Sequence, residues 1–533
     1  MKRKLFGALA LCCAAAVPLF ADGVGIGSDT MDDQPREAPA PEYYSPRIQA
    51  LTAFIAALTE EDNHKQAEAL IEVVKYDPAR AELPLFYFSK AVTTPELARQ
   101  YAPELFKLAE ENPDDIIIAV HCAGIGKLAG SDQSQMAGIL RRTLESYRTR
   151  DPEESQRTAL NTVFAQYLAS QASLNEFVPA CEIIESCCIA PERFGARDYV
   201  PLFSAADFCF VAQFREKIGV ADAGNAAELE KKVFEAISRL PVDNIEKARQ
   251  LTTFYKRRRL NDKAVETAKK FFDAHPGNRA AQLLMLETAT EAGDVETVDK
   301  LLAETAVSQR ANGAYFRIIS RTIAGDLEGA QKLLEEDKNK ASRANMLLLI
   351  LLRTKDYPAM LKLLTDKNLA GVNFGDTPML LIMIAEKLRN PELLKRAAEI
   401  AGEASFEAPT MANAFGYVSA VLDQDLDQAE KMVQKAIDAD PGNAAYLDSM
   451  AWVKFKQGKL EEATEWINRS LRNADPFIGA GVLLEHAGDI AAARRQPEEA
   501  KRYYRLALGQ EKFDDELAPE AVAKKLAALE KQP

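Results

Sequence analysis

Apolar residues along most of this chain recur with the spacing of amphipathic helices. The first such series lies on one helix face and consists of Ile48, Leu51, Phe54, Ile55 and Leu58. After residue 45 we find no alternation of apolar and polar residues long enough to predict a strand. The triplet Ile116-Ile117-Ile118 follows two aspartates and fits a buried helix better than a strand. The pattern therefore predicts an all-α protein.

Proline interrupts the helical pattern at intervals in the first half of the chain. Because proline cannot continue a helix, each interruption indicates the end of one helix and the start of another. The intervals between these prolines are 35, 39, 39 and 50 residues, which predicts divergent helix pairs with long loops between residues 46 and 243. The prolines are Pro78, Pro113, Pro152, Pro191 and Pro241.

The repeat becomes regular after residue 243. Residues that we assign to the start of the second helix in each pair recur at a mean spacing of about 34 residues, a spacing typical of helix-pair repeats. Two antiparallel helices cannot bury their apolar stripes alone, so each pair must pack on the next. A small residue at the crossing lets the two backbones approach. The assigned residues are Ala264, Val298, Ala330, Met360, Leu394, Ala429, Ala463 and Ala500.

The stretch from Asn413 to Leu508 resembles the tetratricopeptide repeat family, as found in exported bacterial proteins. Gly488, Ala500 and Tyr504 fall on the small and aromatic positions of that family. The resemblance covers residues 240–510 well and residues 46–240 loosely. It implies a right-handed α-solenoid of tetratricopeptide helix pairs, with a divergent helical-repeat N-terminal half.

The first 21 residues have the pattern of a secretory signal peptide. Lys2, Arg3 and Lys4 precede an apolar run that ends near Val17, and Ala21 offers a small residue at the cleavage site. Cys12 and Cys13 lie inside the run, but neither has the small residue before it that lipid attachment requires. The sequence therefore predicts an exported protein, periplasmic or associated with the cell envelope.

These patterns divide the chain into five parts. We predict a signal peptide at 1–21, a disordered linker rich in proline and glycine at 22–45, divergent helical repeats at 46–243, tetratricopeptide repeats at 244–512, and a C-terminal capping helix and tail at 513–533.

The charge of the chain excludes some partners. With 66 basic and 80 acidic side chains, the formal net charge is −14. Such a surface repels phosphate groups and anionic lipids, so we expect neither nucleic-acid binding nor strong membrane binding. The one basic run, Lys256 to Arg259, comes at a predicted helix end, where cations interact favourably with the helix dipole.

No pattern of catalytic or metal-binding residues stands out in the sequence. His64, His121, His275 and His486 are not spaced as metal ligands, and phosphate-binding and serine-nucleophile motifs are absent. His121 and Cys122 are adjacent, but neighbouring residues on a helix point about 100° apart. We therefore predict no catalytic role, no metal and no cofactor.

Four cysteines lie close together in the sequence, at Cys181, Cys187, Cys188 and Cys209. Cys181 and Cys188 would be about 10 Å apart on a straight helix, which is too far for a disulfide. Two alternatives stay open: a disulfide from Cys209 to one of the other three, or buried free thiols.

The resemblance implies that the first helix of each pair lines a concave groove that binds a peptide or a partner helix. On the matching positions we predict a partner-binding surface formed by Asp448, Trp452, Lys456, Glu485 and Asp489. Trp452 has two interpretations, an anchor facing the groove or a residue packed between repeats. The sequence thus predicts an exported, non-catalytic scaffold for a protein or peptide partner. The alternative is a glycan- or solute-capturing envelope (lipo)protein that stacks sugars on Trp452 and Trp466.

Overall fold

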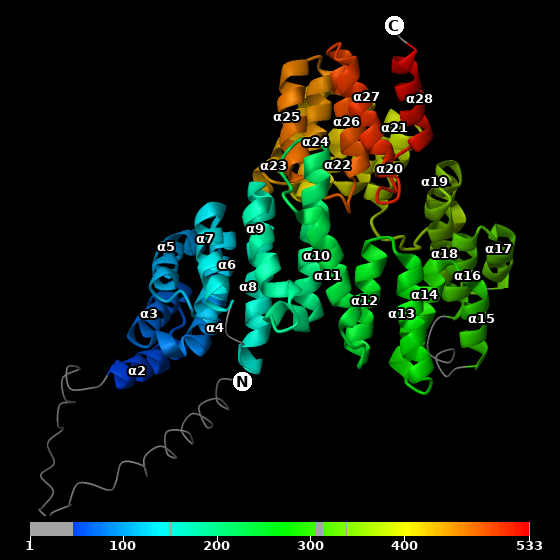
Figure 1. Cartoon of the computed structure of the whole chain (residues 1–533). Helices are drawn as coiled ribbons and strands as arrows, with labels where there is room; N and C mark the ends of the chain where they lie inside the picture. Colours follow the sequence, from blue (N-terminus) through cyan, green and yellow to red (C-terminus); the bar gives the residue numbers. More distant parts are fainter. Residues whose placement is uncertain (1–45, 149–151, 305–312, 337, 532–533) are drawn as a thin grey trace, which may run out of the picture.

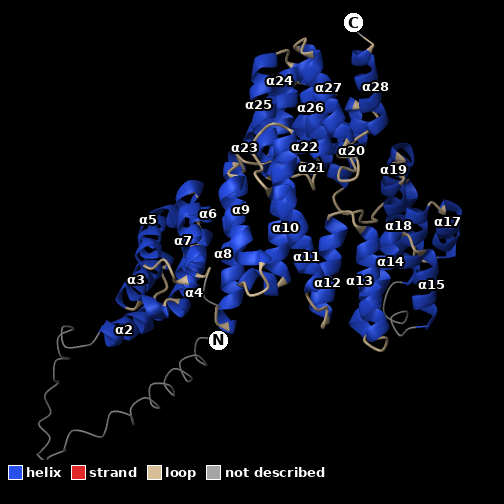
Figure 2. Ribbon diagram, in the orientation of Figure 1, coloured by secondary structure: helices blue, strands red, loops and turns tan. Residues whose placement is uncertain are grey.

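Every regular element in the described part of the protein is a helix, which confirms the all-α prediction (Figure 2). The computed structural model describes residues 46–148, 152–304, 313–336 and 338–531, so the predicted signal peptide at 1–21 and linker at 22–45 lie outside the described residues. None of the helices in these ranges combines the length and the apolar character needed to cross a membrane.

The N-terminal half consists of helices of unequal length, and two of their connections contain short 3₁₀ or π segments. Its elements are α2 (Pro46–Thr59), α3 (Asn63–Tyr76), η3 (Pro78–Arg80), α4 (Glu82–Ala91), α5 (Pro95–Glu111), α6 (Ile116–Ala129), α7 (Gln133–Ser146), α8 (Glu154–Leu174), α9 (Phe177–Ile184), η4 (Glu185–Ile189), η5 (Phe194–Arg197), α10 (Tyr199–Lys217) and α11 (Ala226–Arg239).

The C-terminal half is a regular series of helix pairs closed by one further helix. Its elements are α12 (Ile245–Arg257), α13 (Asn261–Ala274), α14 (Arg279–Ala292), α15 (Val295–Glu304), α16 (Gly313–Ala324), α17 (Leu327–Glu336), α18 (Lys340–Arg353), α19 (Tyr357–Thr365), η7 (Lys367–Leu369), α20 (Thr377–Lys387), α21 (Pro391–Ala401), η8 (Glu403–Glu407), α22 (Pro409–Val421), α23 (Leu426–Ala439), α24 (Ala444–Lys456), α25 (Leu460–Asn473), α26 (Ala480–Ala493), α27 (Pro497–Leu508) and α28 (Pro519–Glu530).

The local sequence explains where many helices begin. Asp115 caps α6, because its side chain accepts hydrogen bonds from the backbone N–H groups of Ile117 and Ile118. Ile116 and Ile118 are 2% and 0% exposed, so the isoleucine triplet belongs to a buried helix, as predicted. Asn443 caps α24 in the same way, immediately after the proline and glycine that end the preceding pair.

The predicted repeat register is present from α13 to α27. All eight assigned residues, including Met360 and Leu394, lie in the second helix of a pair and are at most 3% exposed. The close approach at these crossings is clearest at Gly488 of α26. A Cβ atom there would lie 2.4 Å from the ring of Tyr504 in α27, so no larger residue fits without a backbone shift.

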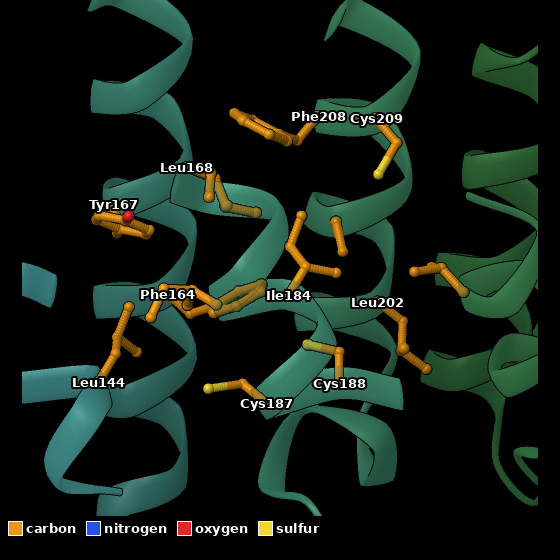
Figure 3. Close-up of a cluster of buried hydrophobic side chains, with 14 of the residues drawn as sticks. Leu144, Phe164, Tyr167, Leu168, Ile184, Cys187, Cys188, Leu202, Phe208 and Cys209 are labelled. Carbon is orange, nitrogen blue, oxygen red and sulfur yellow. The ribbon is translucent and has the colours of Figure 1, made fainter. Parts of the chain in front are cut away.

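The cysteine cluster belongs to the core that α6 to α12 share (Figure 3). Cys187 and Cys188 lie on η4, a single π turn, and Gly195 packs so closely that its Cβ would be 2.4 Å from the Cys188 sulfur. The structure records each of the five cysteines in the described ranges as a buried free thiol, which matches the second of the two alternatives. Burial raises the pKa of the Cys181 and Cys187 thiols to about 11.

The path of the chain turns back on itself after α19. Figure 1 shows α12 to α19 running away from α10, and α20 to α28 returning above α10 and α11. The turn occurs at the connection of residues 366–376, which contains η7. The superhelix therefore brings the last repeats into contact with helices near the middle of the sequence.

Candidate partner-binding groove

A pocket opens on the inner face of the superhelix where it turns. Its volume is about 430 Å³, and its walls are the first helices of two successive pairs, α18 and α20. Leu349 is 40% exposed although it lies in the wall, so the pocket presents apolar surface to solvent. The lining residues are Asn345, Leu348, Leu349, Leu352, Phe374, Asp376, Met379, Leu380 and Met383.

The sequence of these two helices explains the pocket. Residues 346–352 and 379–384 are apolar without interruption, so both helices are apolar on more faces than packing against the second helices can cover. The connection at 366–376 is longer than the turns inside the pairs and contributes Phe374 to the wall. Asn345 and Asp376 are the polar groups of the pocket.

Aromatic side chains continue the inner face on α22, α24 and α26. The rings of Trp452 and His486 are stacked with centroids 4.2 Å apart, and Trp452 also lies 4.9 Å from Phe455. Tyr417 reaches the same group from α22, with its ring 6.0 Å from that of His486. Because three successive repeats contribute, the cluster fixes their relative positions and forms part of the inner surface.

A buried ion pair lies beneath the aromatic cluster. The Asp448 carboxylate is 2.9 Å from Nδ1 of His486, and the two residues are 5% and 6% exposed. Burial alone would lower the pKa of His486, but Asp448, Asp489 and Glu485 outweigh it and raise that pKa above its usual value. The pair therefore favours a protonated histidine inside the repeat array.

The acidic residues of α26 are already paired within the chain. Lys525 of α28 lies 2.8 Å from Glu485 and 2.6 Å from Asp489, and the Tyr504 hydroxyl donates to Asp489 at 2.7 Å. Burial, and then the hydrogen bond to Asp489, raise the pKa of Tyr504. The last helix thus covers this end of the inner face.

Two buried polar atoms on the inner face lack a hydrogen-bond partner among the residues that the structure describes. They are Oδ1 of Asn413 on α22 and Nε1 of Trp452 on α24. One is an acceptor and the other a donor, and both are buried on successive first helices.

Comparison with curated proteins gives a match to part of the chain. No family model matches the chain. The TPR repeat-containing protein PA4667 of Pseudomonas aeruginosa is 26% identical over 118 residues, which is 22% of this chain and 18% of the relative. Over this stretch the chain is similar to a protein that contains tetratricopeptide repeats. The match spans less than a fifth of the relative's own length.

Two solved structures show only a general likeness to this chain. The APC/C hetero-tetramer Cut9-Hcn1 aligns with a TM-score of 0.31 at 14% identity, covering 90% of this chain and 98% of that one. Yeast Tom70 aligns with a TM-score of 0.29 at 13% identity, covering 91% of this chain and 96% of that one.

The structure places the five predicted groove residues on the first helices of two successive repeats, but most are less available than expected. Asp448 is buried against His486, and Glu485 and Asp489 are 16% and 15% exposed and paired with Lys525. Lys456 lies 2.6 Å from Asp423. A partner-binding surface at these positions requires accessible side chains, but the next repeat and the last helix supply partners for Asp448 and Glu485 and cover them.

Trp452 combines the two interpretations that the sequence left open. Its ring packs between repeats against His486, yet the residue is only half-buried and its Nε1 has no partner within the described ranges. Sequence analysis missed Leu349, Met379 and Met383, which line the pocket, and Tyr417, whose ring lies against His486. The signal was present in the uninterrupted apolar runs of α18 and α20, which are more apolar than one-sided packing requires.

Elsewhere in the chain, the side chains that could act in catalysis lie in surroundings that make them unreactive. Among the described residues, no group of three or more metal-binding side chains is close enough to hold an ion. Nδ1 of His121 lies 2.7 Å from the Ser89 hydroxyl, and burial lowers the pKa of His121 to about 4. Burial raises the pKa of Cys122 to about 12, so its thiol stays protonated and is a poor nucleophile.

Proposed function

We propose that this protein is a non-catalytic scaffold that binds a protein partner in the groove between α18 and α26. The observation that supports the proposal best is the inner face itself. Its parts are the pocket between α18 and α20, lined by Leu349, Met379 and Met383, and the aromatic cluster at Trp452 on the first helices of later pairs. Exposed apolar surface of this kind, with a few polar groups, is typical of sites that bind a peptide or helix.

The glycan-binding alternative has less support. Stacking of sugars needs open aromatic faces, and each tryptophan has another side chain against its ring. Trp452 is stacked on His486, and the Arg469 guanidinium lies 4.2 Å from the centre of the Trp466 ring. The apolar pocket also offers fewer polar groups than a sugar requires.

We further propose that the protein is exported and acts in the cell envelope. The support is the pattern of the first 21 residues, with Lys2, Arg3 and Lys4 before an apolar run and Ala21 before the expected cleavage site. N-terminal sequencing of the protein from cell fractions tests this. A mature N-terminus near Asp22 in the envelope fraction supports export, whereas an intact Met1 in the cytoplasm contradicts it.

Affinity capture from envelope extract, followed by mass spectrometry, tests the binding proposal. The groove variant is Leu349→Glu with Met383→Glu, which places charge in the apolar pocket. The matched control is Ile400→Glu, since Ile400 is 50% exposed on a second helix and does not line the pocket. We expect the wild type and the control to capture the same partner and the groove variant to lose it while keeping its helical circular dichroism. Undiminished capture by the groove variant would place the binding surface elsewhere.

A further inference from the structure

The two ends of the described helical array are covered differently. At the C-terminal end α28 packs across the last pair, with Val522 fully buried and Lys525 paired with Glu485 of α26. The outer side of α28 is polar and carries Glu520 and Lys524, as the end of a repeat array requires. At the other end lies α2 (Figure 1), and the outer side there is apolar.

Exposed apolar side chains form a continuous surface on α2 and α4. Leu51 and Ile55, about one turn apart on α2, are 56% and 36% exposed, and Leu83 and Phe86 on α4 are 52% and 46% exposed. Leu51 and Leu83 line the same pocket of about 280 Å³, so the exposed sides of the two helices adjoin. Single exposed apolar residues are common, whereas a group on adjoining helices indicates a contact surface. We call these four residues the N-terminal face.

The packing beneath the N-terminal face fixes it in place. The ring of Phe54 on α2 lies 6.1 Å from that of Tyr87 on α4, which joins the two helices. On the opposite side of α4, Leu85 and Phe88 are fully buried in the core of the first repeats. Because the inward positions of α4 are filled, its exposed apolar pair cannot be buried by a rotation of the helix.

Two charges flank the exposed apolar pair on α4. Glu82 lies in the first turn and Lys90 in the last, and both are exposed. With 3.6 residues per turn, positions 82, 83, 86 and 90 fall within roughly 100° around the helix axis. Nζ of Lys90 lies 4.2 Å from the centre of the Phe86 ring, so charge and apolar surface are contiguous. From its first turn to its last, the exposed side of α4 is therefore acidic, apolar, apolar and basic.

Two antiparallel copies of α4 match this order. Position 86 is midway between positions 82 and 90, so a two-fold axis at Phe86 places Glu82 of each copy opposite Lys90 of the other. An acidic first turn and a basic last turn also suit the dipole of a single helix, so the charges by themselves select no partner. The apolar pair between them does, because a partner that covers it must be apolar at the same place.

The chain before α2 matches the N-terminal face less well than a second copy does. Residues 22–45 contain six aspartate and glutamate residues, one arginine and three prolines. A segment of this composition has few large apolar side chains, and its net charge has the same sign as Glu82. A second copy offers the same apolar residues, with the opposite charge facing each end of α4.

We infer that two copies of this protein associate through the N-terminal face, with their α4 helices antiparallel across a two-fold axis. The face consists of a few half-exposed side chains, fewer than the roughly 20 residues per partner of a typical stable interface, so we expect a dimer that dissociates on dilution. The pocket between α18 and α20 lies on the other side of the molecule (Figure 1), so the inference does not rest on the proposed function. Each dimer would carry two copies of that pocket.

Sedimentation velocity of the purified full chain over about a hundredfold range of concentration tests the association, because mass action favours a dimer at high concentration. We expect the average mass to rise from that of one chain towards that of two. Phe86→Glu, which places charge on the proposed axis, should stay monomeric while keeping its helical circular dichroism. The matched control is Ile400→Glu, since Ile400 is exposed to a similar degree on α21 and should leave the association unchanged.

Charge reversal tests the antiparallel arrangement. Glu82→Lys places two cations opposite each other and Lys90→Glu places two anions opposite each other, and each change acts twice in a two-fold dimer. We expect each single variant to associate at least about tenfold more weakly, and the double variant to recover most of the loss. Positions 82 and 90 are roughly 12 Å apart along one helix, too far to pair within a chain, so only an intermolecular contact explains recovery. Lys107→Glu, on the exposed side of α5, is the control.

Oxidative crosslinking locates the axis. Phe86→Cys places a thiol where the two copies meet, and we expect copper phenanthroline to convert this variant into a covalent dimer. Lys107→Cys should stay monomeric under the same conditions. The wild type, whose described cysteines are buried, is treated in parallel and gives the background.

Four results would overturn the inference. They are a wild type that is monomeric at the highest concentration, undiminished association of Phe86→Glu, no recovery in a folded double charge-reversal variant, and equal crosslinking of Phe86→Cys and Lys107→Cys. A monomeric chain in which the thiol of Phe86→Cys also reacts slowly with maleimide would show that another part of the same chain covers the face. Loss of partner capture by the groove variant leaves all these outcomes unchanged, so the two proposals fail separately.

Discussion

Replacing Asp448 with alanine tests the buried pair at the centre of the groove. If Asp448 were exposed in the groove, as a residue of the predicted partner-binding surface would be, the change would cost about 0.5 kcal/mol or less. In the structure it is 5% exposed and 2.9 Å from Nδ1 of His486. Alanine leaves His486 buried without its acceptor, and an unsatisfied buried donor costs about 1–3 kcal/mol.

The cost of Asp448→Ala should depend on pH in a defined direction. His486 has a folded-state pKa above the unfolded value of about 6.5. The contribution of the Asp448–His486 pair to the free energy of unfolding is therefore fully present below about pH 6.5. It is lost as the pH rises through the folded-state pKa of His486. We expect Asp448→Ala to destabilise the protein more at pH 6 than at pH 9.

Urea unfolding at the two pH values, followed by circular dichroism and tryptophan fluorescence, measures this. Repeat arrays need not unfold in one step, so the midpoint of the fluorescence transition, which reports on Trp452 and Trp466, is the relevant quantity. Asp438→Ala is the matched control because Asp438 is an exposed aspartate on α23. Equal midpoints for the two variants, or an Asp448→Ala effect that does not change with pH, would refute the buried-pair reasoning.

Three further predictions follow from the packing. Gly488→Ala places a Cβ atom 2.4 Å from the Tyr504 ring and should cost about 1–3 kcal/mol in unfolding experiments, whereas Gly442→Ala, with no atom nearer than 4.0 Å, should cost little. Trp452→Ala removes a stacked but half-buried ring and should lower the free energy of unfolding by about 2–4 kcal/mol; a negligible change would show that the ring does not join the repeats. Iodoacetamide labelling at pH 8 with peptide mapping should leave the five described cysteines unmodified in the native protein. After unfolding without reductant, all five should be modified. Two cysteines that are modified only after a reductant is added would reveal a disulfide.

The repeat register could be predicted from sequence because it depends on local spacing. The assigned residues from Ala264 to Ala500 are all buried in second helices, and even Met360 and Leu394, which are not small, occupy equivalent positions. The first helices were harder to interpret. Where Leu349 and Met383 lie in uninterrupted apolar runs, the sequence does not show which side chains face the groove and which face the neighbouring helix.

The contact between the last repeats and the helices from α10 to α12 could not be predicted, because it depends on the summed curvature of the superhelix. Arg259 and Asp515 are 256 residues apart in sequence and come together only after several small rotations between repeats. The basic run from Lys256 to Arg259 is unusual in an acidic chain. From the neighbouring sequence alone, it was interpreted as a set of cations at a helix end. The burial of Asp448 was missed for a different reason, since His486 comes from the next repeat and not from the same helix.

Site-specific photo-crosslinking tests the central claim, that the inner groove holds a protein partner, most directly. A benzoylphenylalanine residue is introduced at Met383, which lines the pocket, and in a separate variant at Ile400, which is exposed on a second helix. Irradiation of cells that express each variant should give a discrete protein adduct from position 383 and none from position 400. An adduct from position 400 with none from position 383 would contradict the account and place the partner on the outer face of the superhelix.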